Sequence, residues 1–153
     1  MPEITVVITT YNLEAYIGAC LEELFSGTYQ DFDVVLVDDC SKDKTVSIIK
    51  AYAEKFPGRI HSAFLQKNLG SPAKTRNWAL DSGFIDGKYV VFLDGDDSLE
   101  PEYLEKLHTL ALQNGADVAV CAYDRVEEGS GRVLCTEMQG FPALMTLPPE
   151  DDT

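Results

Sequence analysis

The sequence contains no pair of cysteines at the spacing of a metal site. Its four cysteines are scattered, and they form no ligand pattern with its two histidines. A cysteine-based metal site or a CxxC redox site is therefore excluded. Cys20 and Cys121 lie in apolar patterns and are most simply interpreted as small buried hydrophobes. Such thiols fit a reducing cytoplasm.

Basic residues are also scarce. The chain has 12 Lys and Arg against 26 Asp and Glu, which gives a net charge of −14 at pH 7. An acidic protein repels nucleic acid and anionic membrane surfaces, so neither is an expected partner. Eight of the 12 basic residues nevertheless lie between Lys42 and Arg76. A small anionic ligand can therefore still meet a locally positive region.

Long apolar runs are absent as well. No stretch approaches the length that crosses a bilayer, and the first residues have no basic-then-apolar signal pattern. We therefore expect a cytoplasmic protein with no membrane span in this chain, associated with a membrane, if at all, through parts of the full protein outside it. No GxGxxG motif follows the first apolar segment and no Walker A loop is present, which disfavours dinucleotide-binding and P-loop functions.

What the sequence does contain is a regular alternation of strand patterns and amphipathic helix patterns. Its 153 residues suffice for one domain with a sizeable core. The alternation predicts an α/β fold with a mostly parallel sheet flanked by helices. We place this domain at 1–136 and expect 137–153 to be an irregular tail or the start of an acceptor-binding part that the chain lacks. The expected strands are 4–9, 34–37, 60–65, 89–93, 117–123 and 132–136, and the expected helices are 16–25, 43–56, 72–82 and 101–114.

Acidic residues follow the strand at 89–93. This strand is apolar on both faces, which predicts a central strand buried between helices. Asp94, Asp96 and Asp97 come directly after it. Three such close carboxylates repel one another unless a cation or a hydrogen-bonded ligand compensates, and a divalent metal that carries a phosphorylated ligand is suited to that. The alternative is a solvated acidic turn that caps the next helix.

Two other strands also end in polar residues. In a parallel sheet all three strand ends lie at one edge, where open α/β sheets bind ligands. A base, a ribose and a diphosphate can each find partners there. The candidates are Thr9, Asn12 and Asp39 for the base and ribose, Asp96 and Asp97 for Mn²⁺ or Mg²⁺, and Lys74 and Arg76 for the phosphates.

Two conspicuous residues are expected to be structural. Asp38 directly precedes Asp39, and we expect it to be a structural neighbour rather than a ligand. Trp78 lies in the third helical pattern, and we expect it in the core. Neither residue is therefore a site candidate.

Four motifs in register carry a resemblance to a known family. They are ITTYN after the first strand, VDDCSKDKT after the second, NLGSPAKTRN before the third helix and FLDGDD at the end of the fourth strand. In this order and at these distances they resemble the nucleotide-binding half of the family 2 glycosyltransferases, over about residues 2–123. The resemblance implies a Rossmann-like GT-A fold, truncated before the acceptor-binding half, and a setting such as cell-envelope polysaccharide synthesis.

The resemblance also implies a role for each matching residue. Thr9 and Tyr11 match the first nucleotide-binding loop, and Asp39 matches the residue that accepts a hydrogen bond from the uracil imide. The segment that closes over base and phosphates is matched by Asn68, Gly70, Arg76 and Asn77. The DxD region is matched by Asp94, Asp96 and Asp97. Within the DxD region, Asp96 matches the ribose contact and Asp97 the metal ligand. Lys74 and Thr75 depart from the small residues that the family usually has before Arg-Asn.

The function implied by the resemblance is sugar transfer from a nucleotide-sugar donor. UDP-sugar is the expected donor and a saccharide or other hydroxyl the acceptor, with inversion and metal assistance. The family's general base belongs to the acceptor-binding half, so we expect it beyond Thr153 and expect the chain to be cut there. Two alternatives remain. One is a non-catalytic nucleotide-sugar-binding module; the other is a haloacid-dehalogenase-type phosphohydrolase, whose DxDx[TV] motif needs Thr or Val where Ser98 stands.

Overall fold

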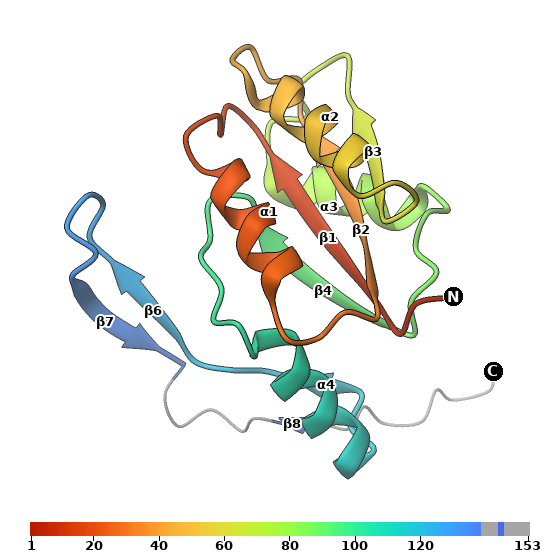
Figure 1. The fold of residues 1–153 in the computed structure, drawn as a ribbon, viewed down its shortest axis with the longest axis vertical. Helices are drawn as coiled ribbons and strands as arrows, with labels where there is room; N and C mark the ends of the chain where they lie inside the picture. Colours follow the sequence, from red (N-terminus) through yellow and green to blue (C-terminus); the bar gives the residue numbers. More distant parts are fainter. Residues whose placement is uncertain (139–143, 146–153) are drawn as a thin grey trace. The chain divides into compact units, whose positions relative to one another are not determined.

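Every predicted site residue lies in the first of two units of the chain. The structure is a computed structural model that describes residues 1–138 and 144–145 (Figure 1). The chain divides into Met1–Pro101 and Glu102–Thr153. Among the described residues, the first unit holds the parallel sheet and the second holds short antiparallel strand pairs. The expected domain boundary near residue 136 stays a prediction.

The first unit is built on a parallel sheet with the strand order β3-β2-β1-β4. Its strands are β1 (Ile4–Thr10), β2 (Phe32–Asp38), β3 (Ile60–Phe64) and β4 (Tyr89–Asp94). β1 and β2 are the inner strands, and every residue of both is buried. Continuous apolar runs are typical of strands covered on both faces. The predicted mostly parallel α/β fold is confirmed.

The register of the sheet places its polar strand ends side by side. Thr9 of β1 pairs with Asp94 of β4, and Thr10 of β1 pairs with Asp38 of β2. Because parallel strands run in the same direction, their carboxyl ends form one edge. The strand ends that are followed by polar residues in the sequence therefore lie together at that edge.

Helices cover both faces of this sheet. α1 (Ile17–Ser26) and α2 (Thr45–Lys55) lie in front of it in Figure 1, and α3 (Pro72–Asp81) lies behind it, against β1 and β2. Ala79 of α3 packs against buried valines of those two strands. Within 1–138 and 144–145, no helix has the length and apolar character needed to cross a membrane.

The prediction that 89–93 is a central strand, buried on both faces, is wrong for the described residues. β4 is an edge strand, because β1 pairs with one side of it and no described strand pairs with the other. Leu93 is buried, whereas Val90 and Phe92 are 37% and 45% exposed. Since successive strand residues point to opposite faces, Val90 and Phe92 share the face that Leu93 does not use. An apolar run by itself does not distinguish an edge strand from a central one.

Trp78 is not a core residue of the described structure either. It is 36% exposed. α3 turns Thr75 and Ala79, four residues apart, toward the sheet, and the residue next to Ala79 points about a quarter-turn away from that face. The expectation failed because a place in an apolar helical segment does not by itself put a side chain on the helix face that contacts the sheet.

The elements of the second unit are α4 (Tyr103–Asn114), β5 (Val118–Ala119), β6 (Tyr123–Val126), β7 (Val133–Glu137) and β8 (Leu144–Met145). Gly115 ends α4 in a left-handed conformation with φ 57°, which is typical of a glycine that follows the last turn of a helix. β6 and β7 pair as antiparallel strands, and β7 overlaps the expected strand 132–136. The expected strand 117–123 is instead divided between β5, which pairs with β8, and the first residue of β6. Residues 139–143 and 146–153 of the expected irregular tail lie outside the described residues.

Gly87 sets the start of β4 against β1, and its replacement should destabilise the sheet. A Cβ there would lie 2.4 Å from the nitrogen of Thr5 and 2.7 Å from the carbonyl carbon of Ile4, both backbone atoms of the inner strand. We expect Gly87→Ala to lower the free energy of unfolding by about 2 kcal/mol or more. Gly18→Ala is the matched control, because its nearest neighbour is a side-chain atom of Ile48 at 3.9 Å. Urea unfolding compares the two, and equal stability would refute the close approach at Gly87.

Candidate functional site

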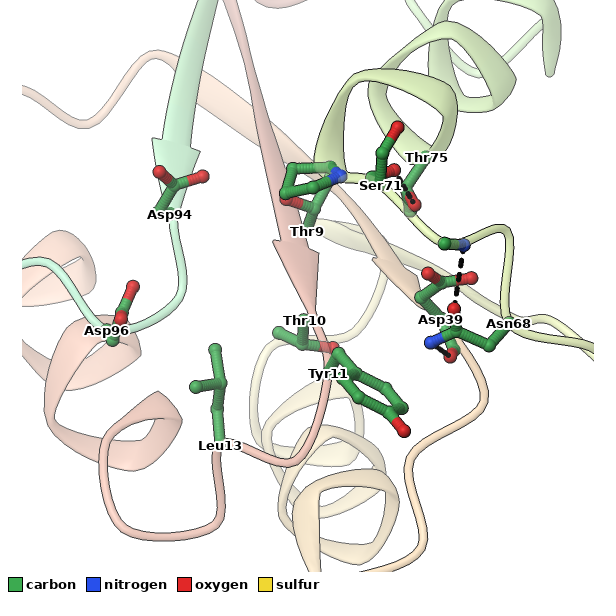
Figure 2. Close-up of a pocket in the computed structure, with 12 residues that line it drawn as sticks. Thr9, Thr10, Tyr11, Leu13, Asp39, Asn68, Ser71, Thr75, Asp94 and Asp96 are labelled. Carbon is green, nitrogen blue, oxygen red and sulfur yellow. Dashed lines mark hydrogen bonds between the residues drawn. The ribbon is translucent and has the colours of Figure 1, made fainter.

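A cavity of about 400 Å³ lies at the carboxyl edge of the sheet. β1, β2 and β4 end beside it and α3 begins beside it (Figure 2). Figure 2 shows Asp39 and Asn68 at one end and Asp94 and Asp96 at the other, with Tyr11 between them. The volume is within the range of about 300–1,000 Å³ that is usual for small-molecule sites. The lining residues are Thr9, Thr10, Tyr11, Leu13, Asp39, Asn68, Gly70, Ser71, Pro72, Thr75, Asp94 and Asp96.

The cavity brings together most of the residues predicted from sequence. Thr9, Tyr11, Asp39, Asn68, Gly70, Asp94 and Asp96 line it, whereas Asn12, Lys74, Arg76 and Asp97 do not. Thr10, Leu13, Ser71, Pro72 and Thr75 line it without having been predicted. A signal existed for two of them, because Ser followed by Pro is the pattern of a helix start, and a helix that follows a strand end starts at the same edge.

Asp39 is held in the cavity wall by the loop that follows β3. The residue is 6% exposed, and its Oδ1 accepts a hydrogen bond of 2.7 Å from the N–H of Leu69. Its own N–H donates to the carbonyl of Thr10 at 2.8 Å. Burial penalises a carboxylate unless donors surround it. In the part of the chain that the structure describes, Oδ2 has no such donor, so a ligand can supply one.

Asp38, in contrast, is fully engaged within the chain. Its Oδ1 accepts from the hydroxyls of Thr10 at 2.9 Å and Ser41 at 2.5 Å, and its Oδ2 accepts from the N–H of Ser41 at 2.9 Å. It is 1% exposed and does not line the cavity. These bonds give Asp38 the structural role that was expected of it.

Asn12 joins the loop after β1 to the loop after β2. Its N–H donates to Ser41 Oγ and its Oδ1 accepts from the N–H of Lys42, both at 2.8 Å. It has φ 52°, in the left-handed region that asparagine enters more readily than most residues. These bonds fix the loop that carries Tyr11. A contact between Asn12 itself and a nucleotide stays a prediction.

Arg76 neutralises one of the three acidic residues. Its Nη2 donates to Asp94 Oδ1, and its guanidinium carbon lies 6.0 Å from the ring centre of Phe92. Partial burial, and then the charge of Asp94, raises the pKa of Asp97. Asp96 takes part in no ion pair among the described residues. The same residues contain no group of three or more Asp, Glu, His or Cys placed to hold a metal ion.

The acidic loop is attached to helix α1. Glu23 Oε2 accepts from the N–H of Leu99 at 2.8 Å. Gly95 lies so close to β1 that a Cβ there would come within 2.9 Å of Thr10 Cγ2. These contacts fix the backbone that presents Asp96. Sequence patterns give no signal for Glu23, because an acidic residue on an amphipathic helix has the same pattern as a solvated surface residue.

The start of α3 forms the wall between the two ends of the cavity. Ser71 caps the helix through its Oγ, which accepts from the N–H of Lys74 at 3.3 Å, and Pro72 occupies the first turn. The unpaired N–H groups of a helix start carry a partial positive charge that favours anions. Lys74 itself is exposed and does not line the cavity, so its contact with a phosphate stays a prediction.

Comparison with known proteins identifies the family of this chain. The model of the family described as Glycosyl transferase family 2 matches residues 5–138. The chain belongs to glycosyltransferase family 2. Glycosyltransferase GlyA of Streptococcus pneumoniae is 34% identical over 129 residues, which are 84% of this chain and 18% of GlyA. The whole cavity lies within the region matched to the family.

Two solved structures show the fold. TarS of Staphylococcus aureus, residues 1–349 in complex with UDP-GlcNAc, matches 83% of this chain and 36% of its own with a TM-score of 0.74 and 32% identity. The mannosyltransferase PcManGT of Pyrobaculum calidifontis, in complex with GDP-Man and Mn²⁺, gives a TM-score of 0.66 and 27% identity over the same shares. The predicted GT-A fold is therefore confirmed, and this chain spans well under half the length of these relatives. They are glycosyltransferases, so they lend no support to the phosphohydrolase alternative.

Replacement of Asp38 should destabilise this edge of the sheet. In Asp38→Ala, the hydroxyls of Thr10 and Ser41 and the N–H of Ser41 lose their acceptor. Because each buried donor left unpaired costs about 1–3 kcal/mol, we expect a loss of at least about 2 kcal/mol in the free energy of unfolding. Asp38→Asn keeps the shape and one acceptor, and should lose less. Denaturant titration measures both losses, and an Asp38→Ala variant as stable as the parent would disprove the structural role.

Proposed function

We propose that this chain is the donor-binding part of an inverting glycosyltransferase and that it binds a UDP-sugar together with Mn²⁺ or Mg²⁺. One observation carries the proposal: a single cavity has the carboxylate of Asp39 at one end and those of Asp94 and Asp96 at the other (Figure 2). A nucleoside diphosphate carries its groups in a matching order, with a base at one end, the ribose hydroxyls in the middle and the charged diphosphate at the other end.

The Asp39 end suits the base. Asp39 Oδ2 can accept from the imide N–H of uracil, because Oδ1 is already taken by Leu69. Tyr11 is exposed in the cavity wall, where its ring offers a surface on which a base can stack. Uracil is the base we assign, because the TarS complex with UDP-GlcNAc resembles this chain more closely than the PcManGT complex with GDP-Man.

The acidic end fits a divalent cation held between protein and substrate. Asp96 and Asp97 are the candidate ligands. Burial first, and the charge of Asp94 second, raise the pKa of Asp97, and a bound cation would favour its charged form. Mg²⁺ is usually bound by one or two carboxylates together with substrate phosphates, so a preformed set of three protein ligands is not required. When bound, the cation supplies charge neutralisation for the diphosphate as it leaves.

Polar groups in and beside the cavity would hold the ribose and phosphates. Asp96 is the proposed ribose acceptor as well as a metal ligand. Arg76, paired with Asp94, and the start of α3 at Ser71 bring positive charge to the phosphate side. Thr9 lines the cavity between the two ends and can donate or accept through its hydroxyl.

Transfer also needs an acceptor hydroxyl and a general base within hydrogen-bond reach of it. Of the carboxylates that line the cavity, Asp39 and Asp96 are assigned to the nucleotide and the metal, and Asp94 pairs with Arg76, so none of them is left for this role. We therefore propose that the base, like the acceptor site, lies outside the residues that line this cavity, in the acceptor-binding half that the family resemblance implies. Inversion then follows from direct displacement of the diphosphate by the acceptor oxygen.

Nucleotide binding should depend on a divalent cation. Because the acidic loop and the diphosphate repel each other, we expect UDP to bind at least about tenfold more tightly with Mn²⁺ than with chelator, a difference of about 1.4 kcal/mol that calorimetry resolves. Asp96→Asn should abolish most of this metal effect. The same affinity with Mn²⁺ and with chelator would refute the metal assignment.

Asp39 should determine much of the affinity for UDP. Asp39→Ala removes a hydrogen bond between a charged acceptor and the base, and should weaken UDP binding by about 1.5–3 kcal/mol. Asp81→Ala is the control, because it makes the same charge change at an exposed position that does not line the cavity. Calorimetry gives the affinities and circular dichroism checks the fold. Unchanged UDP affinity in a folded Asp39→Ala variant would remove the base assignment.

A further inference from the structure

Both polar atoms of the Asn68 side-chain amide have partners within the chain. Its Nδ2 donates to the backbone carbonyl of Asp39 at 3.1 Å (Figure 2). Its Oδ1 accepts from the N–H of Gly70 at 2.7 Å. The amide therefore bridges the end of β2 and the loop that follows β3, two segments 29 residues apart in the sequence.

This bridge aligns the next residue with the Asp39 carboxylate. The N–H of Leu69 donates to Asp39 Oδ1 at 2.7 Å. Gly70 then takes φ 79°, a left-handed conformation that glycine adopts without strain and that turns its N–H back to Asn68. The loop thereby occupies one carboxylate oxygen and, among the described residues, leaves the other without a donor. The orientation of the Asp39 carboxylate thus depends on the loop.

We propose that Asn68 is a positioning residue for base selection. It holds the Leu69 N–H against Asp39 Oδ1 and so presents Oδ2 to the imide N–H of uracil. Asn68 acts through Asp39 and not through a contact of its own with the nucleotide. The proposal rests on the proposed function, in which Asp39 binds the base.

Selection between uracil and cytosine separates this role from a direct contact. Uracil has an N–H at ring position N3, whereas cytosine has a lone pair there, which a carboxylate oxygen repels. A carboxylate held in one orientation therefore favours UDP over CDP, and a carboxylate that is free to rotate loses part of that preference. An Asn68 side chain that contacted ribose or phosphate would instead affect both nucleotides equally.

The test is calorimetry of UDP and CDP, with excess Mn²⁺, on the full 153-residue chain and its variants. We expect Asn68→Ala to weaken UDP binding about tenfold and leave CDP binding unchanged, so that the preference for UDP falls by the same factor. Asn68→Ser should behave likewise, because its hydroxyl can still accept from the Gly70 N–H and keep the turn, but cannot donate to Asp39. Gln66→Ala is the matched control, because this amide on the same loop donates to Phe64 and does not line the cavity.

Three outcomes would overturn the inference. Unchanged preference in Asn68→Ala would show that Asp39 keeps its orientation without the bridge. Equal losses for UDP and CDP in folded Asn68→Ser would indicate a direct contact with the ribose or phosphate. A parent chain that binds neither nucleotide would overturn the proposed function, and the inference with it, whereas the first two outcomes leave donor binding intact. Thermal unfolding of each variant identifies losses that come from a damaged fold.

Discussion

The pairing of β1 with β2 on one side and β4 on the other is the constraint on which the rest of the site depends. Through it, Thr9 lies beside Asp94 and Thr10 beside Asp38. A shift of one residue in either pair would turn every side chain of the strand to the opposite face of the sheet. The complete burial of β1 and β2 resists such a shift. The geometry of the cavity is therefore a consequence of the core below it.

Four aspartates at this edge differ in function because they differ in what already pairs with them. Asp38 receives three hydrogen bonds from the chain, Asp39 receives one on its carboxylate, and Asp94 pairs with Arg76. Asp96 faces the cavity with no ion pair among the described residues. Asp38 and Asp39 are buried, and a buried carboxylate needs compensation, whereas Asp94 and Asp96 are partly or largely exposed. The oxygens that the chain leaves uncompensated are those at which a base donor and a cation are expected.

Most of the fold and much of the cavity could be predicted from sequence. The alternation of strand-like and helix-like hydrophobic patterns predicted the strands and helices. Polar residues at the strand ends predicted the edge of the sheet at which the cavity lies, because parallel strands end at the same edge. Three errors came from treating apolar character as burial: β4 is an edge strand, Trp78 is partly exposed, and Cys121, expected to be a small buried hydrophobe, is exposed. A pattern records that a side chain is apolar, but not whether a neighbour covers it. Glu23, which accepts a hydrogen bond from the acidic loop, could not be predicted, because its sequence pattern is that of a solvated surface residue.

The sequence by itself determined the order of strands and helices along the chain, the sheet edge at which polar residues gather and the family resemblance. All three depend on local periodicity and on motifs along the chain. Only the tertiary structure decided which of those polar residues pair with other residues of the chain and which keep atoms available to a ligand. Asn68 reaches Asp39 across 29 residues and Arg76 reaches Asp94 across 18. Such bonds form or fail over a few tenths of an ångström. That precision comes from the packing of distant segments, and no local pattern of residues encodes it.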